Sequence, residues 1–180
     1  LAEELRRGRR VVLEGAPGAG KTTTLLQLAQ TLVASGQLCL VVDLPAWIES
    51  GLDLLAFQEL SPAFRSRSVS GADVGALVAT QPLVIFLNGW NEVGEAHATV
   101  AANRLRTLNR DYPGAGILLA TRPHALAPLL AGAWHVAIQP LRGAQRRMYI
   151  SSLLGARGRE LFDHLETKPT LDALTRTPLI

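Results

Sequence analysis

The sequence of 180 residues predicts an α/β fold with a mostly parallel, five-stranded sheet between two layers of helices, and three observations lead to this prediction. Five short segments are apolar throughout, which is typical of strands that are buried on both faces of a parallel sheet. Helical patterns alternate with these segments, as in βαβ units. A glycine-rich turn joins the first strand to the first helix.

The first strand is expected at residues 9–15, and a helix at residues 21–36 follows it. The apolar side chains of this helix recur with the spacing of one helical face, at Leu25, Leu28, Ala29 and Leu32. Gly36 is well suited to end the helix, because glycine readily adopts the left-handed conformation found there. The second strand is expected at residues 37–44.

The same alternation continues along the chain. The next expected elements are helices at 51–60 and 71–80, a strand at 82–88, a helix at 95–110, and strands at 114–123 and 134–141. From about residue 141 onward the pattern is helical only. We therefore expect an α/β domain at residues 1–139, followed by a small helical subdomain at 140–180 that is truncated.

The composition is that of a globular chain outside the membrane. Hydrophobic residues make up 48% of it, but no apolar run approaches the roughly 18 residues of a membrane helix. The charged start lacks a signal-peptide pattern, and Cys39, the only cysteine, reads as a small core residue. These features indicate a cytoplasmic location. The terminal residue Leu1 and the unfinished last segment indicate a fragment of a longer protein.

The net charge of the chain is too small to indicate a class of binding partner. The net charge is only +3, which by itself gives no argument for nucleic acid. The arginines form two clusters, one of Arg6, Arg7, Arg9 and Arg10 and one of Arg146 and Arg147. Solvated faces are the preferred interpretation of both clusters, and contacts with phosphate or another subunit are the alternative.

The glycine-rich turn, "GAPGAGKT", matches the phosphate-binding P-loop pattern G-x-x-x-x-G-K-[ST]. Chance would give roughly 0.002 matches in a chain of this composition, so we prefer a P-loop to a ligand-free turn. A Rossmann dinucleotide site is a weaker alternative, because the glycine spacing differs. Backbone N–H groups and the helix N-terminus can bind phosphate, Lys21 can contact it, and Thr22 can ligate Mg²⁺. The expected nucleotide-binding residues are Gly15, Ala16, Pro17, Gly18, Ala19, Gly20, Lys21, Thr22 and Thr23.

The segment "PLVIFLNGWNEV", residues 82–93, allows two interpretations. Asn-Gly after an apolar run is a strong β-hairpin signal. The end of a buried strand is also where P-loop enzymes place acidic residues that hold magnesium. We favour the second interpretation, because the residues after Gly89 do not alternate as a strand would.

The three segments "VVLEGAPGAGKTT", "PLVIFLNGWNEV" and "GILLATRP" together resemble the NACHT group of STAND-type P-loop NTPases. In that family the third strand typically ends in Asp-Gly-x-Asp-Glu, and a later strand ends in Ser/Thr-Arg-Pro. The resemblance implies that Asn88 replaces the magnesium-orienting acid, that Asn91 replaces a second acid, and that Glu92 is retained. It also implies a γ-phosphate-sensing role for Arg122. "RTPLI" resembles the family's adenine-contacting segment, which makes Pro178 a candidate, although an ordinary helix-ending proline is equally consistent.

The two asparagines are the departure from the family pattern. An amide oxygen can accept a hydrogen bond from a magnesium-bound water, but it brings no charge to the ion. We therefore expect weak metal holding by Thr22 and Asn88, retained nucleotide binding, and slow hydrolysis that depends on Glu92.

Other polar residues are weaker candidates. The four histidines, His97, His124, His135 and His164, lack metal-ligand spacing, although His124 follows Arg122 closely enough to face a nucleotide. Asp43 ends the second strand, where a local cap is a better explanation than a role in the site.

The expected catalytic residues are accordingly Lys21, Glu92 and Arg122, with ATP or ADP and Mg²⁺ as cofactors. The resemblance implies a weak ATPase that acts as a signalling switch and assembles with copies of itself through the nucleotide domain, with effector and sensor regions outside this fragment. The alternatives are a nucleotide-locked scaffold that hydrolyses nothing and, more remotely, a small-molecule kinase. No guanine-reading motif is visible, which favours adenine.

Overall fold

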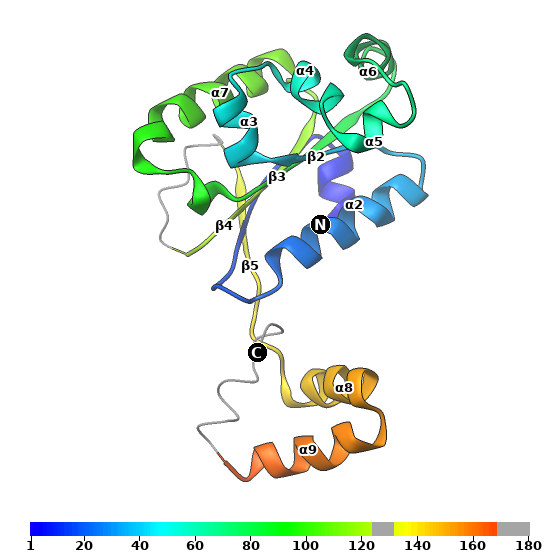
Figure 1. The fold of residues 1–180 in the computed structure, drawn as a ribbon, viewed down its shortest axis with the longest axis vertical. Helices are drawn as coiled ribbons and strands as arrows, with labels where there is room; N and C mark the ends of the chain where they lie inside the picture. Colours follow the sequence, from blue (N-terminus) through cyan, green and yellow to red (C-terminus); the bar gives the residue numbers. More distant parts are fainter. Residues whose placement is uncertain (124–131, 169–180) are drawn as a thin grey trace.

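A five-stranded parallel sheet forms the centre of the molecule in a computed structural model that describes residues 1–123 and 132–168 (Figure 1). The strands are β1 (Arg10–Glu14), β2 (Leu38–Asp43), β3 (Leu83–Asn88), β4 (Gly116–Thr121) and β5 (Trp134–Ala137). Their order across the sheet is β2-β3-β4-β1-β5, and every neighbouring pair is parallel. The predicted α/β fold and all five predicted strands are therefore confirmed.

Helices make up most of the other regular structure in the described residues. They are α1 (Ala2–Arg6), α2 (Lys21–Ala34), α3 (Leu44–Ser50), α4 (Leu54–Glu59), α5 (Pro62–Arg65), α6 (Gly71–Val78), α7 (Ala98–Asp111), α8 (Gly143–Leu154) and α9 (Ala156–Glu166), with short 3-10 turns η1 (Trp90–Glu92) and η2 (Glu95–His97). In the part of the chain that the structure describes, no helix combines the length and apolar character needed to cross a membrane.

Two hydrophobic cores lie on opposite faces of the sheet, because successive strand residues point to opposite sides. One core joins the sheet to α1 and α2 and contains Leu13, Leu25 and Phe86. The other joins it to α3, α4 and α7 and contains Val12, Ile85 and Leu105. Figure 1 shows α2 on one side of the sheet and α3, α4 and α7 on the other. The strands are thus buried on both faces, as their continuous apolar runs predict.

The end of α2 shows how local sequence fixes an element boundary. Gly36 has a φ of +81°, and its N–H donates to the carbonyl of Val33 while the N–H of Gln37 donates to the carbonyl of Leu32. This is the Schellman arrangement, in which a left-handed glycine satisfies the last carbonyls of a helix. Of the four predicted apolar residues, Leu25, Ala29 and Leu32 are buried and Leu28 is partly buried.

Three short helices were not expected: α1, α3 and α5. The helix α3 begins directly at the end of β2, where the Asp43 carboxylate accepts a hydrogen bond from the N–H of Ala46 at 3.0 Å. Asp43 is therefore a helix cap, as the preferred interpretation of the sequence predicted.

Cys39 on the same strand is partly buried against the α2 core, and burial raises the pKa of its thiol to about 11.

Asp43→Ala should lower the free energy of unfolding by about 1 kcal/mol, the usual cost of losing an N-cap. Nucleotide affinity should not change, because the carboxylate is used by the backbone of α3. Urea denaturation with calorimetry of nucleotide binding tests both expectations, and Asp43→Asn, which keeps an acceptor oxygen, is the matched control. A loss of affinity without a loss of stability would place Asp43 in the site.

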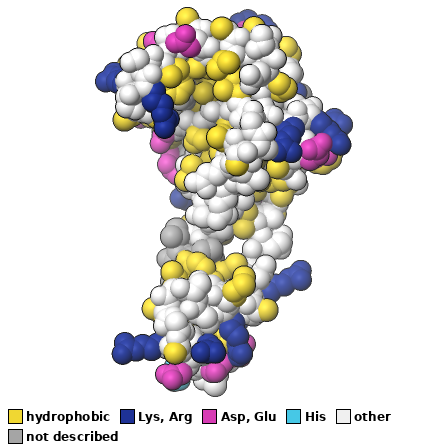
Figure 2. All heavy atoms as spheres, turned by 90° about the vertical axis from the view of Figure 1, so that its right-hand side faces the viewer, with side chains coloured by type: hydrophobic (Ala, Val, Ile, Leu, Met, Phe, Trp, Pro, Cys, Tyr) yellow, Lys and Arg dark blue, Asp and Glu magenta, His cyan; other side chains and the backbone are white. Residues whose placement is uncertain are grey.

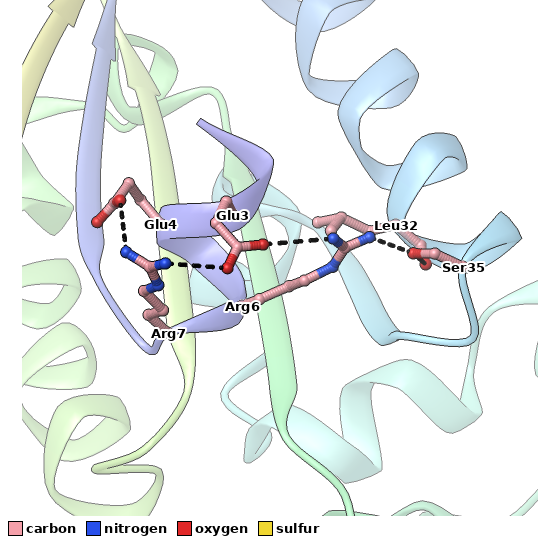
Figure 3. A network of polar contacts seen from close by, with 6 residues as sticks. All are labelled: Glu3, Glu4, Arg6, Arg7, Leu32 and Ser35. Atoms are coloured by element: carbon pink, nitrogen blue, oxygen red, sulfur yellow. Dashed lines mark hydrogen bonds and ion pairs between the residues drawn. The ribbon is translucent and has the colours of Figure 1, made fainter.

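Arg6, Arg7 and Arg9 of the N-terminal arginine cluster form an exposed ion-pair network, whereas Arg10 is partly buried and donates to Oδ1 of Asn109 at 2.6 Å. Arg6 and Arg7 contact Glu3, and Arg7 also contacts Glu4, while Arg6 donates a hydrogen bond to the hydroxyl of Ser35 on the end of α2 (Figure 3). Exposed pairs of this kind contribute little stability each. The solvated-face interpretation therefore holds for Arg6 and Arg7.

The helices α8 and α9 pack against each other below the sheet (Figure 1). Gly158 permits their close approach, because a Cβ there would lie 2.5 Å from the carbonyl oxygen of Ile150. Arg147 is exposed and contacts Asp163 at 2.7 Å. Arg146, by contrast, is only 6% exposed, with its guanidinium over the ring of Phe162. The solvated-face interpretation is thus wrong for Arg146, because the packing of the two helices covers its side chain.

The α8–α9 hairpin also exposes hydrophobic side chains, among them Met148, Leu153 and Leu154 (lower body in Figure 2). The division into domains at 1–139 and 140–180 stays a prediction.

Candidate functional site

The glycine loop connects β1 to α2 and has the backbone that its sequence predicts. Gly18 and Gly20 have φ values of +76° and +86°, which side chains larger than hydrogen rarely allow. The N–H of Gly15 donates to the carbonyl of Thr121 on β4 at 3.2 Å, which fixes the start of the loop to the neighbouring strand. α2 begins at Lys21, so its N-terminal N–H groups face the concave side of the loop.

Lys21 lies across this loop. Its Nζ donates to the carbonyl oxygens of Gly15 at 2.8 Å and Ala16 at 3.0 Å. Burial lowers the pKa of the Lys21 ammonium, the nearby charge of Arg122 lowers it further, and Glu92 opposes the shift. Both charged neighbours predicted from sequence are thus close enough to Lys21 to affect its electrostatics.

A hollow of about 230 Å³ opens beside the loop, and three separate loops line it. The lining residues are Pro17, Gly18, Gly20, Lys21, Thr22 and Thr23 from the glycine loop and α2, Asn88, Gly89, Asn91 and Glu92 after β3, and Arg122 after β4. These segments meet because the carboxyl ends of parallel strands share one edge of the sheet. All three predicted catalytic residues therefore lie in one hollow.

The turn after β3 decides between the two interpretations of the segment 82–93. Within residues 1–123 and 132–168, β3 pairs with β2 and β4, both in parallel, and Asn88-Gly89 does not form a hairpin. Gly89 has a φ of +89°, and the chain then enters the short helix η1 with Trp90 buried. This turn directs Asn88, Asn91 and Glu92 toward the glycine loop.

Thr22 and Asn88 are the pair that the sequence predicts as metal ligands. The Thr22 hydroxyl donates to Oδ1 of Asn88 at 3.4 Å, so the two oxygens lie together at the base of the hollow. Hydroxyl and amide oxygens are suitable ligands for Mg²⁺, but neither is charged. No cluster of three His, Cys, Asp or Glu residues that could hold a metal occurs in 1–123 or 132–168. The residues present fit magnesium as a weakly held ion.

Some predicted residues lie elsewhere. Gly15, Ala16 and Ala19 belong to the loop but do not line the hollow, and Asp43 caps α3. Pro178 and His124 lie outside the described residues. One contact beside the loop has no signal in the sequence: Nδ1 of His135 on β5 lies 2.8 Å from the Glu14 carboxylate.

A larger hollow of about 460 Å³ lies between α3, α4 and α7, away from the glycine loop. The Arg104 guanidinium covers the ring of Trp47 at 5.4 Å there, and both side chains donate to the carbonyl of Leu52. The glycine loop does not reach this hollow, and the Arg104 guanidinium in its wall is already in contact with Trp47 and Leu52. We therefore place the candidate site in the smaller hollow, where charged groups and helix N–H groups converge.

The sheet order and the glycine loop together define the α/β fold of a P-loop NTPase. No family model and no curated protein matches the chain. A solved structure of the replication initiator DnaA bound to AMPPCP and single-stranded DNA matches with a TM-score of 0.61, 14% identity, 97% coverage of this chain and 56% of that chain. A DNA replication initiation factor matches with a TM-score of 0.63, 14% identity, and 96% and 56% coverage.

C. elegans PCH-2 matches with a TM-score of 0.53 and 14% identity, over 84% of this chain and 41% of that chain. This chain therefore spans about half the length of the first structures it matches. The matches agree with the α/β fold with a parallel sheet seen here.

Proposed function

We propose that this chain is an ATP-binding, slowly hydrolysing switch domain. The observation that carries the proposal is the convergence of Lys21, Glu92 and Arg122, from three different loops, on the hollow beside the glycine loop. Two cations and a set of backbone N–H groups there suit a polyphosphate, and one carboxylate is available to orient a water.

Each residue has a distinct proposed role. The backbone of residues 15–20 and the start of α2 bind the phosphates, and Lys21 exchanges its carbonyl partners for phosphate oxygens. Thr22 and Asn88 would hold Mg²⁺, which when bound neutralises phosphate charge. Glu92 accepts a hydrogen bond from the attacking water, and Arg122 contacts the terminal phosphate. Pro178 remains the proposed adenine contact.

The signalling role is a further part of the proposal. It rests on the NACHT-like motifs, with β3 ending in Asn-Gly-x-Asn-Glu and β4 in Thr-Arg-Pro. An arginine that contacts only the terminal phosphate loses its contact on hydrolysis, which can switch the domain between two assembly states. Self-assembly would use the domain at 1–139, and the helical part at 140–180 would follow it. The matched DnaA structure has single-stranded DNA bound, which makes nucleic acid a second class of partner to test for this chain.

A non-hydrolysing scaffold is the second candidate function, and Asn88 and Asn91 favour it. These two residues leave Glu92 as the acid in the lining of the hollow. If Glu92 does not orient a water, the nucleotide would serve only to stabilise the fold.

The variant Glu92→Gln distinguishes the two functions. The switch predicts that hydrolysis in single-turnover assays falls by about 100-fold, because a positioned base contributes this much, while ATP affinity changes little. Glu95→Gln, three residues further on and outside the hollow, is the matched control. The scaffold instead predicts no hydrolysis in the parent and no effect of Glu92→Gln.

A further inference from the structure

We propose that the site takes the metal-free nucleoside triphosphate about as tightly as its magnesium complex, so that divalent cations are dispensable for binding. This inference rests on the proposed nucleotide site and deepens it by naming the charge form of the ligand. Three features of the described residues support the inference: the positive charge of the hollow, the lack of charge on the oxygens that could bind a cation, and the helix-capping role of the nearest acid, Asp43.

The charged side chains that line the hollow are Lys21, Arg122 and Glu92, so its formal charge is positive before any ligand enters. The first N–H groups of α2 and the loop glycines add partial positive charge. A metal-free triphosphate carries more negative charge than its magnesium complex and therefore gains more from this field. Lys21 and Arg122 would provide the neutralisation that Mg²⁺ otherwise provides.

The ligands available to a cation are neutral. The Thr22 hydroxyl donates a hydrogen bond to Oδ1 of Asn88 at 3.4 Å, so the two groups are partnered without an ion. Asn91, the other amide in the lining, is also uncharged. Uncharged oxygens hold a divalent cation much less firmly than carboxylates do.

The nearest acid on the adjacent strand, Asp43, caps a helix and does not contribute its charge to the hollow. Asp43 lies directly beside Asn88 in the register of β2 and β3, at the same edge of the sheet. Its carboxylate accepts the N–H of Ala46 at 3.0 Å and caps α3, and it does not line the hollow. Asp43 therefore does not replace the charge that Asn88 lacks.

The test is calorimetry of ATP binding to the full chain in excess Mg²⁺ and in EDTA. We expect the two dissociation constants to agree within about threefold, because charged protein groups already neutralise the phosphates. Binding that is more than about 30-fold weaker in EDTA would overturn the inference. Absence of binding in both buffers would instead overturn the proposed function.

Asn88→Asp should make binding depend on the metal, because one added charge favours the magnesium complex and repels the free triphosphate. We expect the ratio of the two constants to rise by about tenfold or more. Asn103→Asp, which adds the same charge on the exposed side of α7, is the matched control and should leave the ratio unchanged. An unchanged ratio in Asn88→Asp would contradict the inference.

Thr22→Ala provides a second measurement that does not depend on the folding of Asn88→Asp. If no cation is needed, removing the hydroxyl changes the affinity by the same factor in Mg²⁺ and in EDTA. A loss confined to the Mg²⁺ buffer would show that Thr22 holds a required ion and would overturn the inference.

Discussion

Lys21→Ala is expected to weaken ATP binding by about 100-fold, the largest effect on affinity that we expect from a substitution in the proposed site. A hydrogen-bonded charge pair with phosphate contributes about 3 kcal/mol, which corresponds to this factor. The ammonium already lies at the mouth of the loop, where it donates to the carbonyls of Gly15 and Ala16. Alanine would leave these carbonyls to water and remove one of the two cations of the hollow.

Calorimetry with ATP and with ADP measures this loss, and urea denaturation measures the accompanying change in stability. The fold should persist, because the two lost hydrogen bonds involve carbonyls of an accessible loop and cost about 1 kcal/mol each at most. Lys168→Ala is the matched control, since Lys168 is the other lysine of the chain and is exposed after α9. An ADP dissociation constant that Lys21→Ala leaves unchanged would contradict the phosphate-binding role of the loop.

The strands and the glycine loop could be predicted from sequence because each carries a local signal. A strand that is apolar throughout, such as Leu83–Leu87, must be buried on both of its faces. A parallel sheet with helices packed on both sides provides this burial. The loop needs left-handed glycines at Gly18 and Gly20, which its sequence supplies. The meeting of Asn88 and Arg122 in one hollow then follows from parallel strand directions alone.

The short helices could not be predicted in the same way. Helices of four to seven residues, such as α1, α3 and α5, have too few turns to be stable by propensity and depend on tertiary packing. α1 is mostly charged, and a single residue, Leu5, is buried from it. Similarly, nothing local indicates that Arg146 is covered while Arg147 is exposed, because this depends on how α9 packs.

The side-chain contacts within the site could not be predicted from the sequence either. From the sequence we expected Lys21 to contact phosphate. The sequence did not indicate that its ammonium donates to the carbonyls of Gly15 and Ala16, as it does in the structure. The contact between His135 and Glu14 joins residues that are far apart in the chain and share no motif. Such pairs require the strand order, with β5 beside β1, before they can be expected.

Gly116→Ala should produce the largest loss of stability that we predict, about 3 kcal/mol in the free energy of unfolding. Gly116 begins β4 where α1 crosses it, and a Cβ there would lie 2.0 Å from the carbonyl oxygen of Leu5 and 2.8 Å from its carbonyl carbon. Backbone atoms cannot rotate away as a side chain can, so α1 must move off the strand. This movement would expose the fully buried Leu5 side chain, and the estimate is at the upper end of overpacking costs.

Gly114→Ala is the matched control, because Gly114 lies two residues earlier in the same segment and a Cβ there meets no atom within 4 Å. This control should be neutral or slightly stabilising, since alanine restricts the unfolded chain. Urea denaturation of the parent and both variants measures the difference, and hydrogen exchange of residues 1–8 shows whether α1 is released. Equal stability of Gly116→Ala and the parent would mean that α1 does not pack against β4 as closely as described, and that its contribution to the core is small.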